Sequence, residues 1–219
     1  MNIIQKIYKD LLEMHGYQGW WPLTSINYHP KDYSYPKNNK QKYEICIGCI
    51  LTQNTSWKQA KKALSNLNIS NLLDPISIIN SNINKLKNLI KPAGYFNQKS
   101  KKLIEFTKFY LTLKNKKPSR EELLNIWGIG QETADSMLLY AFKTPSFIID
   151  NYTKRILIQF KLIKENTPYQ EIKNVFEKNL KKDLKVYQEY HALLVKHAKL
   201  YYNKNSNQKL CPLYKKYKS

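Results

Sequence analysis

A glycine turn and a carboxylate twenty residues after it are the parts of this sequence best suited to chemistry. Gly128-Ile129-Gly130 forms a tight turn, and apolar residues at helical spacing follow it: Ala134, Met137, Leu138, Ala141 and Phe142. Glycine permits a positive φ and a close approach of phosphate to the backbone, and the amides that open a helix attract anions. Asp150 follows the apolar run 147–149. The pattern predicts an anion-binding turn and a carboxylate able to stabilise a cation or activate a water.

The composition restricts the classes of protein that this chain can be. It has 219 residues with 42% hydrophobic content, which is enough for a substantial core. It has no stretch of 18 apolar residues and no signal-peptide pattern, so we expect a cytoplasmic, nucleoid-associated protein without a membrane partner. The formal net charge of +21 favours a polyanion as partner, nucleic acid first. A genome rich in Lys, Asn, Ile and Tyr codons is the alternative cause of that charge.

The cysteines and histidines predict neither a metal site nor a disulfide framework. Cys46 and Cys49 lie in an apolar run, which indicates buried helix side chains rather than a redox or zinc pair. The cysteine count is odd, with Cys211 the third, and no secretory signal accompanies it. The four histidines form no ligand set at metal-binding spacing.

The hydrophobic spacing predicts an all-α fold. We expect helices over 3–12, 43–51, 57–67, 72–79, 83–89, 97–113, 134–142, 152–160, 169–180 and 186–201. A further helix is expected to start within 118–122, with Ser119 as its N-cap. The stretch 16–39 is rich in Pro, Tyr, Asn and Gly and predicts an ordered aromatic loop. The polar tail 203–219 is expected to be loose at its end.

The glycine turn, its helix, Asp150 and the basic helix start at Lys154 and Arg155 resemble the helix-hairpin-helix plus aspartate signature of the endonuclease III-like (HhH-GPD) DNA glycosylases. The segments 19–22, 51–57 and 91–99 resemble the type III 3-methyladenine DNA glycosylases within that superfamily. The resemblance covers most of 15–202. It implies a central helical lobe over 43–144, which contains the helix-hairpin-helix at about 123–142. A second helical lobe would be formed by 1–42 and 145–219, with the hairpin and Asp150 at the cleft between the lobes.

The resemblance implies a monofunctional DNA N-glycosylase that hydrolyses the N-glycosidic bond of alkylated purines in base excision repair. Asp150 would stabilise the oxocarbenium-like sugar and activate a water, while capping of the next helix is an alternative role compatible with catalysis. Bifunctional relatives carry a nucleophilic lysine where this chain has Glu132, which implies no AP-lyase step. Glu132 is either a residue of the site or an ordinary acid favoured by the helix dipole.

Aromatic side chains at Trp20, Trp21 and Trp57, with Pro22, would line a flat pocket for the base if the resemblance holds. An N-alkylated purine is cationic, so it gains both stacking and cation–π attraction between indoles. The alternative is that Trp20 and Trp21 anchor the N-terminal loop. Because adjacent residues face different sides, at least one of the two is expected to be structural.

The expected partner is double-stranded DNA containing damaged bases, bound by a monomer. The resemblance implies phosphate contacts from the backbone amides of Gly128, Gly130 and Gln131. Gln53 or Asn54 would be the wedge that replaces the flipped base, and capping of the following helix is the alternative for both. Basic side chains either contact phosphates or are solvated surface: Lys99, Lys101, Lys102, Lys154, Arg155 and Lys199.

Many relatives bind a [4Fe–4S] cluster through four C-terminal cysteines. This chain keeps only Cys211 of that pattern, so we expect no iron–sulfur cluster. A monovalent cation on the hairpin carbonyls is a further implication of the resemblance. Two alternatives to the alkylpurine glycosylase stay open at this point. One is a glycosylase for oxidised or mismatched bases, such as 8-oxoguanine or uracil and thymine mispairs, and the other is a non-catalytic HhH DNA-binding protein.

Overall fold

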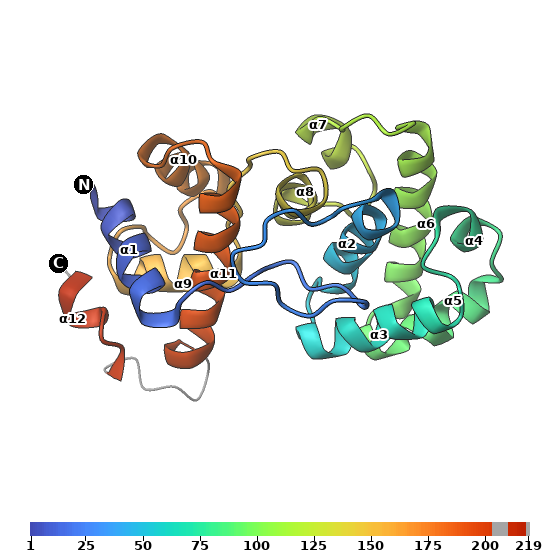
Figure 1. The fold of residues 1–219 in the computed structure, drawn as a ribbon, viewed down its shortest axis with the longest axis horizontal. Helices are drawn as coiled ribbons and strands as arrows, with labels where there is room; N and C mark the ends of the chain where they lie inside the picture. Colours follow the sequence, from blue (N-terminus) through green and yellow to red (C-terminus); the bar gives the residue numbers. More distant parts are fainter. Residues whose placement is uncertain (203–209, 218–219) are drawn as a thin grey trace. The chain divides into compact units, whose positions relative to one another are not determined.

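The computed structural model of the protein describes residues 1–202 and 210–217, in which the regular elements are helices and no β-strand occurs (Figure 1). The α-helices are α1 (Ile3–His15), α2 (Asn39–Leu51), α3 (Trp57–Ile69), α4 (Pro75–Ile79), α5 (Ile83–Ile90), α6 (Phe96–Thr112), α7 (Arg120–Leu124), α8 (Gln131–Ser136), α9 (Asn151–Gln159), α10 (Tyr169–Asn179), α11 (Leu184–Tyr201) and α12 (Tyr214–Tyr217). A 3-10 helix, η1 (Lys91–Ala93), and a π-helix, η2 (Met137–Ala141), complete them. The predicted all-α fold is confirmed.

The chain groups into two compact units. The first contains Met1–Trp20, His29–Tyr33 and Pro145–Ser219, and the second contains Trp21–Tyr28 and Ser34–Thr144. The resemblance implied that all of 1–42 belongs with the C-terminal helices, whereas the structure groups most of 21–42 with the central helices.

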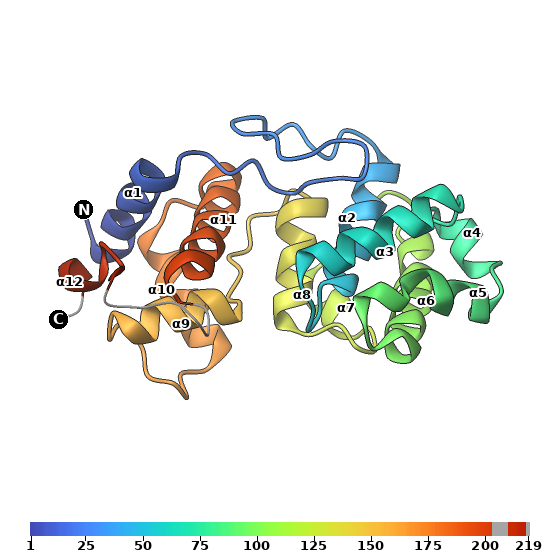
Figure 2. The same cartoon turned by 90° about the horizontal axis from the view of Figure 1, so that it is seen from below.

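In the first unit, α1 and α9 both pack against α11 (Figure 2). A capping box starts α1: the Asn2 side chain accepts from the Gln5 amide, and the Gln5 side chain accepts from the Asn2 amide. Aromatic side chains fill the core, with the Phe147 and Phe176 rings stacked at 4.0 Å between centroids. The Tyr190 hydroxyl donates to the Ile4 carbonyl at 2.9 Å, which satisfies a polar group inside this core.

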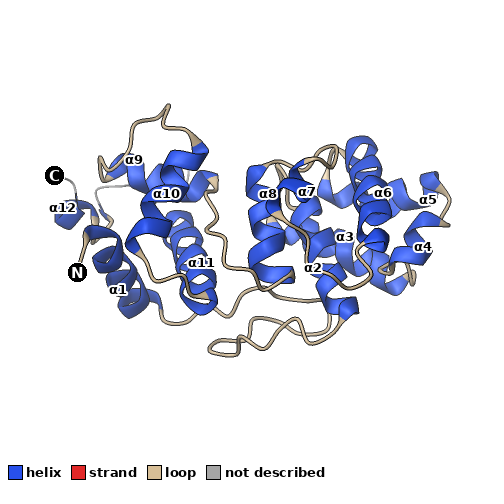
Figure 3. Cartoon of the chain, turned by 90° about the horizontal axis from the view of Figure 1, so that it is seen from above, coloured by secondary structure: helices blue, strands red, loops and turns tan. Residues whose placement is uncertain are grey.

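In the second unit, α2 lies at the centre and contacts α3, α6, α8 and η2 (Figures 1 and 2). Nine consecutive residues of α2, from Tyr43 to Leu51, are buried. A helix surrounded on all sides needs no polar stripe, which explains the unbroken apolar run in the sequence. The connection 16–38 between α1 and α2 has no regular element, as predicted for the aromatic loop (Figure 3).

The helix after the glycine turn changes its winding. It is α-helical over Gln131–Ser136 and then widens into η2, where the Phe142 amide donates to the Met137 carbonyl five residues earlier at 3.0 Å. All five residues of η2 are buried. Single π turns inside α-helices are frequent at functional sites, and this one follows the hairpin directly.

Several helix boundaries differ from the predicted ones. Helix α2 begins at Asn39 because the Asn38 side chain accepts from the Gln41 amide and caps it. Helix α4 begins after its N-cap Asp74, with Pro75 in the first turn. The sequence did not predict η1 or α12. The looseness expected of the tail falls partly on residues 203–209 and 218–219, which lie outside the described residues.

Candidate active site

Asp150 is the N-cap of α9. Its backbone is extended, and its Oδ1 atom accepts a hydrogen bond from the Thr153 amide at 2.7 Å. The extended residues before it are held in place, because the Phe147 amide donates to Glu177 and the Ile149 amide donates to the Tyr169 hydroxyl. The Asp150 side chain keeps 11% of its surface exposed. The capping role predicted for Asp150 is therefore real, and it leaves the second carboxylate oxygen for other groups.

His191 of α11 faces that second oxygen. Its Nε2 atom lies 3.6 Å from Asp150 Oδ2, and its side chain is 6% exposed. Burial by itself would raise the pKa of Asp150, but the interaction with His191 and the hydrogen bond from Thr153 outweigh it and hold the pKa below its usual value. Asp150 is therefore ionised at neutral pH. No motif or spacing in the sequence marks His191, which lies on a helix that is buried along most of its length.

Trp20 packs against His191. The centroids of the indole and the imidazole are 5.7 Å apart, with the rings nearly perpendicular at 85°. Trp20 is half-buried, and it belongs to the same compact unit as Asp150. The structure therefore brings together an aromatic side chain predicted for the base pocket, the predicted catalytic acid and a histidine that the sequence analysis did not assign.

Two cations predicted to bind DNA lie over the Tyr152 ring. The Lys199 Nζ is 5.8 Å from the ring centroid and the Arg155 guanidinium carbon is 5.9 Å from it. Lys199 is exposed, but partial desolvation of its ammonium lowers its pKa, and the negative charge of Asp150 opposes that shift. Arg155 also donates to the Tyr202 carbonyl, which ties α9 to the end of α11. Arg155 thus has a structural role that the sequence did not predict, and Lys154 is half-exposed.

Trp21 has different neighbours from Trp20, as expected for adjacent residues. It is 8% exposed, and its ring centroid lies 5.5 Å from that of Trp57 and 5.2 Å from that of Tyr140. Gly48 makes room for it, because a Cβ there would lie 3.2 Å from the indole nitrogen. Trp57 is half-buried and Pro22 is buried. These aromatic side chains form a cluster in the second unit, which we call the tryptophan cluster.

Two buried carboxylates fix the loop that carries both tryptophans. Glu189, which is 1% exposed, accepts from the Gln18 amide and from the Tyr33 hydroxyl, the latter at 3.0 Å. Glu44, which is 4% exposed, accepts from the Thr24 amide. Burial, which outweighs these hydrogen bonds, raises the pKa of both carboxyls. Neither residue could be identified from the sequence, since nothing in their spacing marks a carboxylate that binds a distant loop.

The hairpin turn has the geometry that its glycines predict. Gly128 has a φ of +83°, and a Cβ on it would lie 2.6 Å from the Lys102 side chain. Gly130 is the N-cap of α8, and no atom lies within 4 Å of where its Cβ would be. Gln131 is exposed beside it. An anion can therefore approach the amides of this turn without meeting a side chain at Gly130.

Hydrogen bonds from the Gln53 side chain brace the hairpin turn. Its Nε2 atom donates to the Gly128 carbonyl at 3.2 Å and to the Thr133 hydroxyl at 2.9 Å, while its Oε1 atom accepts from Lys102 Nζ at 2.6 Å. Neither Gln53 nor Asn54 caps the next helix, so that alternative was wrong: Ser56 is the N-cap of α3. Asn54, which is exposed with a φ of +52°, keeps its place as the predicted wedge.

The prediction that Lys99 is a surface cation was wrong. Lys99 is 2% exposed, and its Nζ atom donates to the carbonyls of Leu51 and Ala93, both at 2.8 Å. Burial, with a smaller effect from Lys102, lowers its pKa to about 8. Lys101 is exposed instead, with its Nζ atom 4.2 Å from the ring centroid of Trp127 in the turn.

Glu132 is exposed in the first turn of α8. The pKa of the Cys49 thiol is raised mainly by burial, and the negative charge of Glu132 raises it further. Cys46 and Cys49 are free and buried on α2, as predicted.

The residues present do not fit an iron–sulfur cluster. Such a cluster takes four cysteines, and Cys211 faces His197 instead, with 3.1 Å between Sγ and Nε2. Over residues 1–202 and 210–217, no group of three or more His, Cys, Asp and Glu side chains could hold a metal ion. Within the same part of the chain, no helix is long and apolar enough to cross a membrane.

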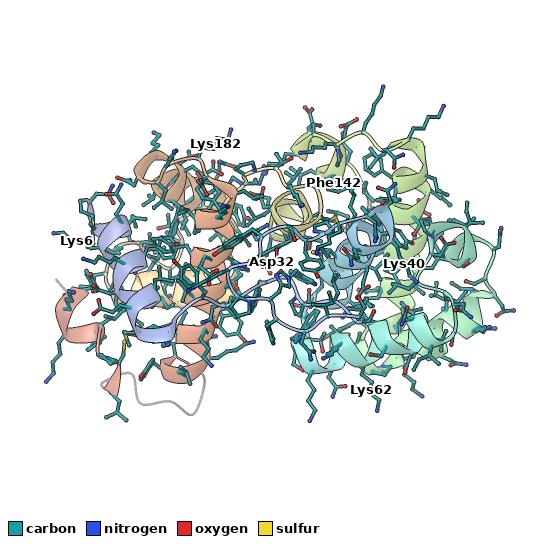
Figure 4. The ribbon with its side chains drawn as sticks, viewed as in Figure 1. Lys6, Asp32, Lys40, Lys62, Phe142 and Lys182 are labelled. Carbon is teal, nitrogen blue, oxygen red and sulfur yellow. The ribbon has the colours of Figure 1, made fainter. Side chains whose placement is uncertain are left out.

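Exposed lysines are spread over both units. Lys6 on α1 belongs to the first unit, Lys40 and Lys62 on α2 and α3 belong to the second, and all three are exposed (Figure 4). With a formal net charge of +21, such a surface attracts the phosphate backbone of nucleic acid irrespective of sequence.

Comparison with known proteins agrees with this geometry. The family model described as "HhH-GPD superfamily base excision DNA repair protein" matches residues 47–182. A Methanocaldococcus jannaschii protein, named as a DNA repair glycosylase by inference, is 44% identical to this chain. The match covers 97% of this chain and 94% of that protein.

Solved structures agree as well. The structure of H. pylori 3-methyladenine DNA glycosylase bound to 1,N6-ethenoadenine is 26% identical, with a TM-score of 0.71 over 90% of this chain and 95% of that chain. A non-covalent endonuclease III–DNA complex is 18% identical, with a TM-score of 0.76 over 99% of this chain and 98% of that chain. The second likeness is one of fold.

Proposed function

Because this chain belongs to the HhH-GPD superfamily of base excision DNA repair proteins, we propose that it is a monofunctional DNA glycosylase for N-alkylated purines of the 3-methyladenine type. DNA is its partner, and hydrolysis of an N-glycosyl bond is its class of reaction. This membership favours an enzyme over the non-catalytic DNA-binding protein that the sequence had left open. The proposal adds the substrate, the catalytic residue, the absence of a lyase step and action by a monomer on damaged double-stranded DNA.

The observation that carries the proposal is the state of Asp150. A carboxylate that is almost buried, ionised and held in one orientation by Thr153 and His191 is suited to stabilise a cation at a fixed position. An acid that served only as a helix cap would need one oxygen for the Thr153 amide. Here the second oxygen faces His191, beside a predicted base-pocket tryptophan, Trp20.

The reaction balances with these groups. The bond between C1′ of the sugar and the purine nitrogen breaks, and its electron pair stays on the base. A purine that carries a positive charge departs neutral and needs no prior protonation. Asp150 stabilises the positive charge that develops on the sugar, a water oxygen bonds to C1′, and the proton of that water passes to the carboxylate and then to solvent.

The tryptophan cluster supports an alkylated purine as substrate. The half-buried Trp57, whose ring is held perpendicular to that of the buried Trp21, offers aromatic surface to a flat base. Stacking on aromatic side chains contributes about 1–3 kcal/mol per base. A cationic base gains cation–π attraction in addition. The 26% identical H. pylori 3-methyladenine DNA glycosylase, whose structure holds 1,N6-ethenoadenine, supports the same class of substrate.

The hairpin residues support DNA binding without lyase chemistry. Glu132 has no amine to form a Schiff base, and the neighbouring Gln131 and Thr133 have none either. We assign phosphate contacts to the amides of Gly128, Gly130 and Gln131. Asn54 is the proposed wedge for the space left by the flipped base. A monovalent cation at the hairpin carbonyls stays a prediction.

A panel of duplex oligonucleotides, each with one damaged base, tests the substrate. We expect the protein to release methylated purines and to leave the abasic strand intact until alkali is added. Release only of oxidised bases, or only of uracil or thymine from mispairs, would refute the alkylpurine assignment. Borohydride treatment during the reaction should trap no covalent adduct, and a trapped adduct would show that an amine acts as nucleophile.

A further inference from the structure

We propose that His191 is a positioning residue for the glycosylase reaction: it holds the free oxygen of Asp150 and connects that carboxylate to Trp20 of the aromatic loop. This inference rests on the function proposed above, because it gives Asp150 the catalytic role. It adds a residue that neither the sequence motifs nor the hairpin indicates.

The two oxygens of Asp150 have different partners. Oδ1 accepts from the Thr153 amide at 2.7 Å, while Oδ2 lies 3.6 Å from His191 Nε2. A buried carboxylate needs donors on its oxygens to stay charged. Of the two, Thr153 belongs to the same helix and fixes only the cap, whereas His191 comes from α11 and sets the direction of the second oxygen.

The distance between His191 and Asp150 suits a positioning contact better than a tight ion pair. At 3.6 Å the contact is slightly longer than a hydrogen bond, so Oδ2 is held on one side without being fully engaged. That oxygen keeps lone pairs for a water or for the developing sugar cation. The contact requires a proton on Nε2 of His191, which either a neutral imidazole or an imidazolium can supply.

Trp20 packs against the imidazole of His191. The perpendicular arrangement, with 5.7 Å between centroids, orients the His191 ring by packing. The loop around Trp20 is itself fixed to α11, because Glu189 accepts from Gln18 and Tyr33. His191 and Glu189 are two residues apart on that helix. A displacement of the loop would therefore reach Asp150 through His191.

Two further cations lie on the helices that carry Asp150 and His191. Lys199 of α11 interacts with it, as its own pKa records. Arg155 of α9 lies over the Tyr152 ring and donates to the end of α11. His191 lies at ion-pair distance from Oδ2, and among the groups that lower the pKa of Asp150 its effect is the largest.

Two substitutions test the hydrogen-bond donor of His191 and its aromatic ring separately. His191→Phe keeps an aromatic ring for Trp20 but removes the donor, and His191→Gln keeps a donor but removes the ring. Lys196→Gln, on an exposed residue of the same helix, is the control for a change in helix charge. Duplex binding and thermal melting of each variant establish that it is folded and binds DNA.

Carboxyl carbon NMR of Asp150 without DNA and single-turnover base release from dimethyl sulfate-treated duplex are the two readouts. In His191→Phe we expect the acid midpoint of Asp150 and the acid limb of the rate profile to move up by about one pH unit or more. At a pH below the Asp150 midpoints of both wild type and variant, a shift of one pH unit corresponds to about a tenfold lower rate for the variant. His191→Gln should restore the midpoint in part, and Lys196→Gln should leave it unchanged.

An unchanged Asp150 midpoint in His191→Phe would overturn the proposal, as would equal shifts in all three variants. The wild-type protein gives a test that needs no variant: imidazole nitrogen NMR should find the proton of His191 on Nε2 at neutral pH, and a bare Nε2 would refute the contact. If no alkylated purine is released, the proposed substrate fails, while the NMR titrations still decide the positioning role.

Discussion

His197 makes the stability of the first unit depend on acid in a way that can be worked out from the structure. It is fully buried, with 3.0 Å between its Nδ1 and His15 Nε2 and 3.1 Å between its Nε2 and Cys211 Sγ. Burial, helped by the charge of His15, lowers its pKa from 6.5 to about 3. Between these two values the unfolded chain binds a proton that the folded chain does not, so stability falls as the pH falls.

The magnitude follows from the shift. Each pKa unit corresponds to about 1.4 kcal/mol, so the free energy of unfolding should lose about 3 kcal/mol through His197 between pH 6.5 and pH 4. Urea unfolding of the wild type and of His197→Phe at half-unit steps measures the difference between their slopes. We expect the wild type to have the steeper slope below pH 6.5, and the two slopes to agree between pH 7 and 8. Parallel slopes down to pH 4 would refute the reasoning.

Three further predictions concern the hairpin. Gly128→Ala should weaken duplex binding and cost about 1–3 kcal/mol of stability, because it combines a positive φ with a clash against Lys102, and unchanged binding and melting would contradict this. Gln53→Leu should cost about 1–3 kcal/mol in urea unfolding and lower DNA affinity, since it removes the partner of the Gly128 carbonyl; a neutral effect on both would show that the brace is dispensable. Lys101→Gln should reduce the slope of log affinity against log salt by about 0.9, and an unchanged slope would place Lys101 away from phosphate.

The helices could be predicted because their signals are local. Helical spacing marked the buried face of α1, and Ser119 was predicted as the N-cap of α7, where the structure shows a capping box with Glu122. The four-residue helix α12 could not be predicted, since a helix this short depends on tertiary contacts. Its Tyr217 packs on Phe160 at 5.6 Å between ring centroids and donates to Asp10.

The motif residues of the site could be predicted, but the residues that support them could not. The glycine turn and Asp150 follow from spacing along the chain. His191 contacts Asp150, more than forty residues earlier in the chain, and Glu189 contacts Tyr33 in the N-terminal loop. Hydrophobic periodicity does not predict contacts over such separations. For Lys99 the prediction from residue type was wrong. A lysine is usually a surface cation, but the ammonium of Lys99 donates to two buried carbonyls.

Base release by wild type and Asp150→Asn on methylated duplex DNA tests the central claim most directly. The substitution keeps the shape of the side chain and an oxygen for the Thr153 amide, but it removes the charge that would stabilise the sugar cation. We predict that the rate of methylated-purine release falls by about 10²–10⁴-fold or more while duplex affinity is retained. Full activity of Asp150→Asn would contradict the account.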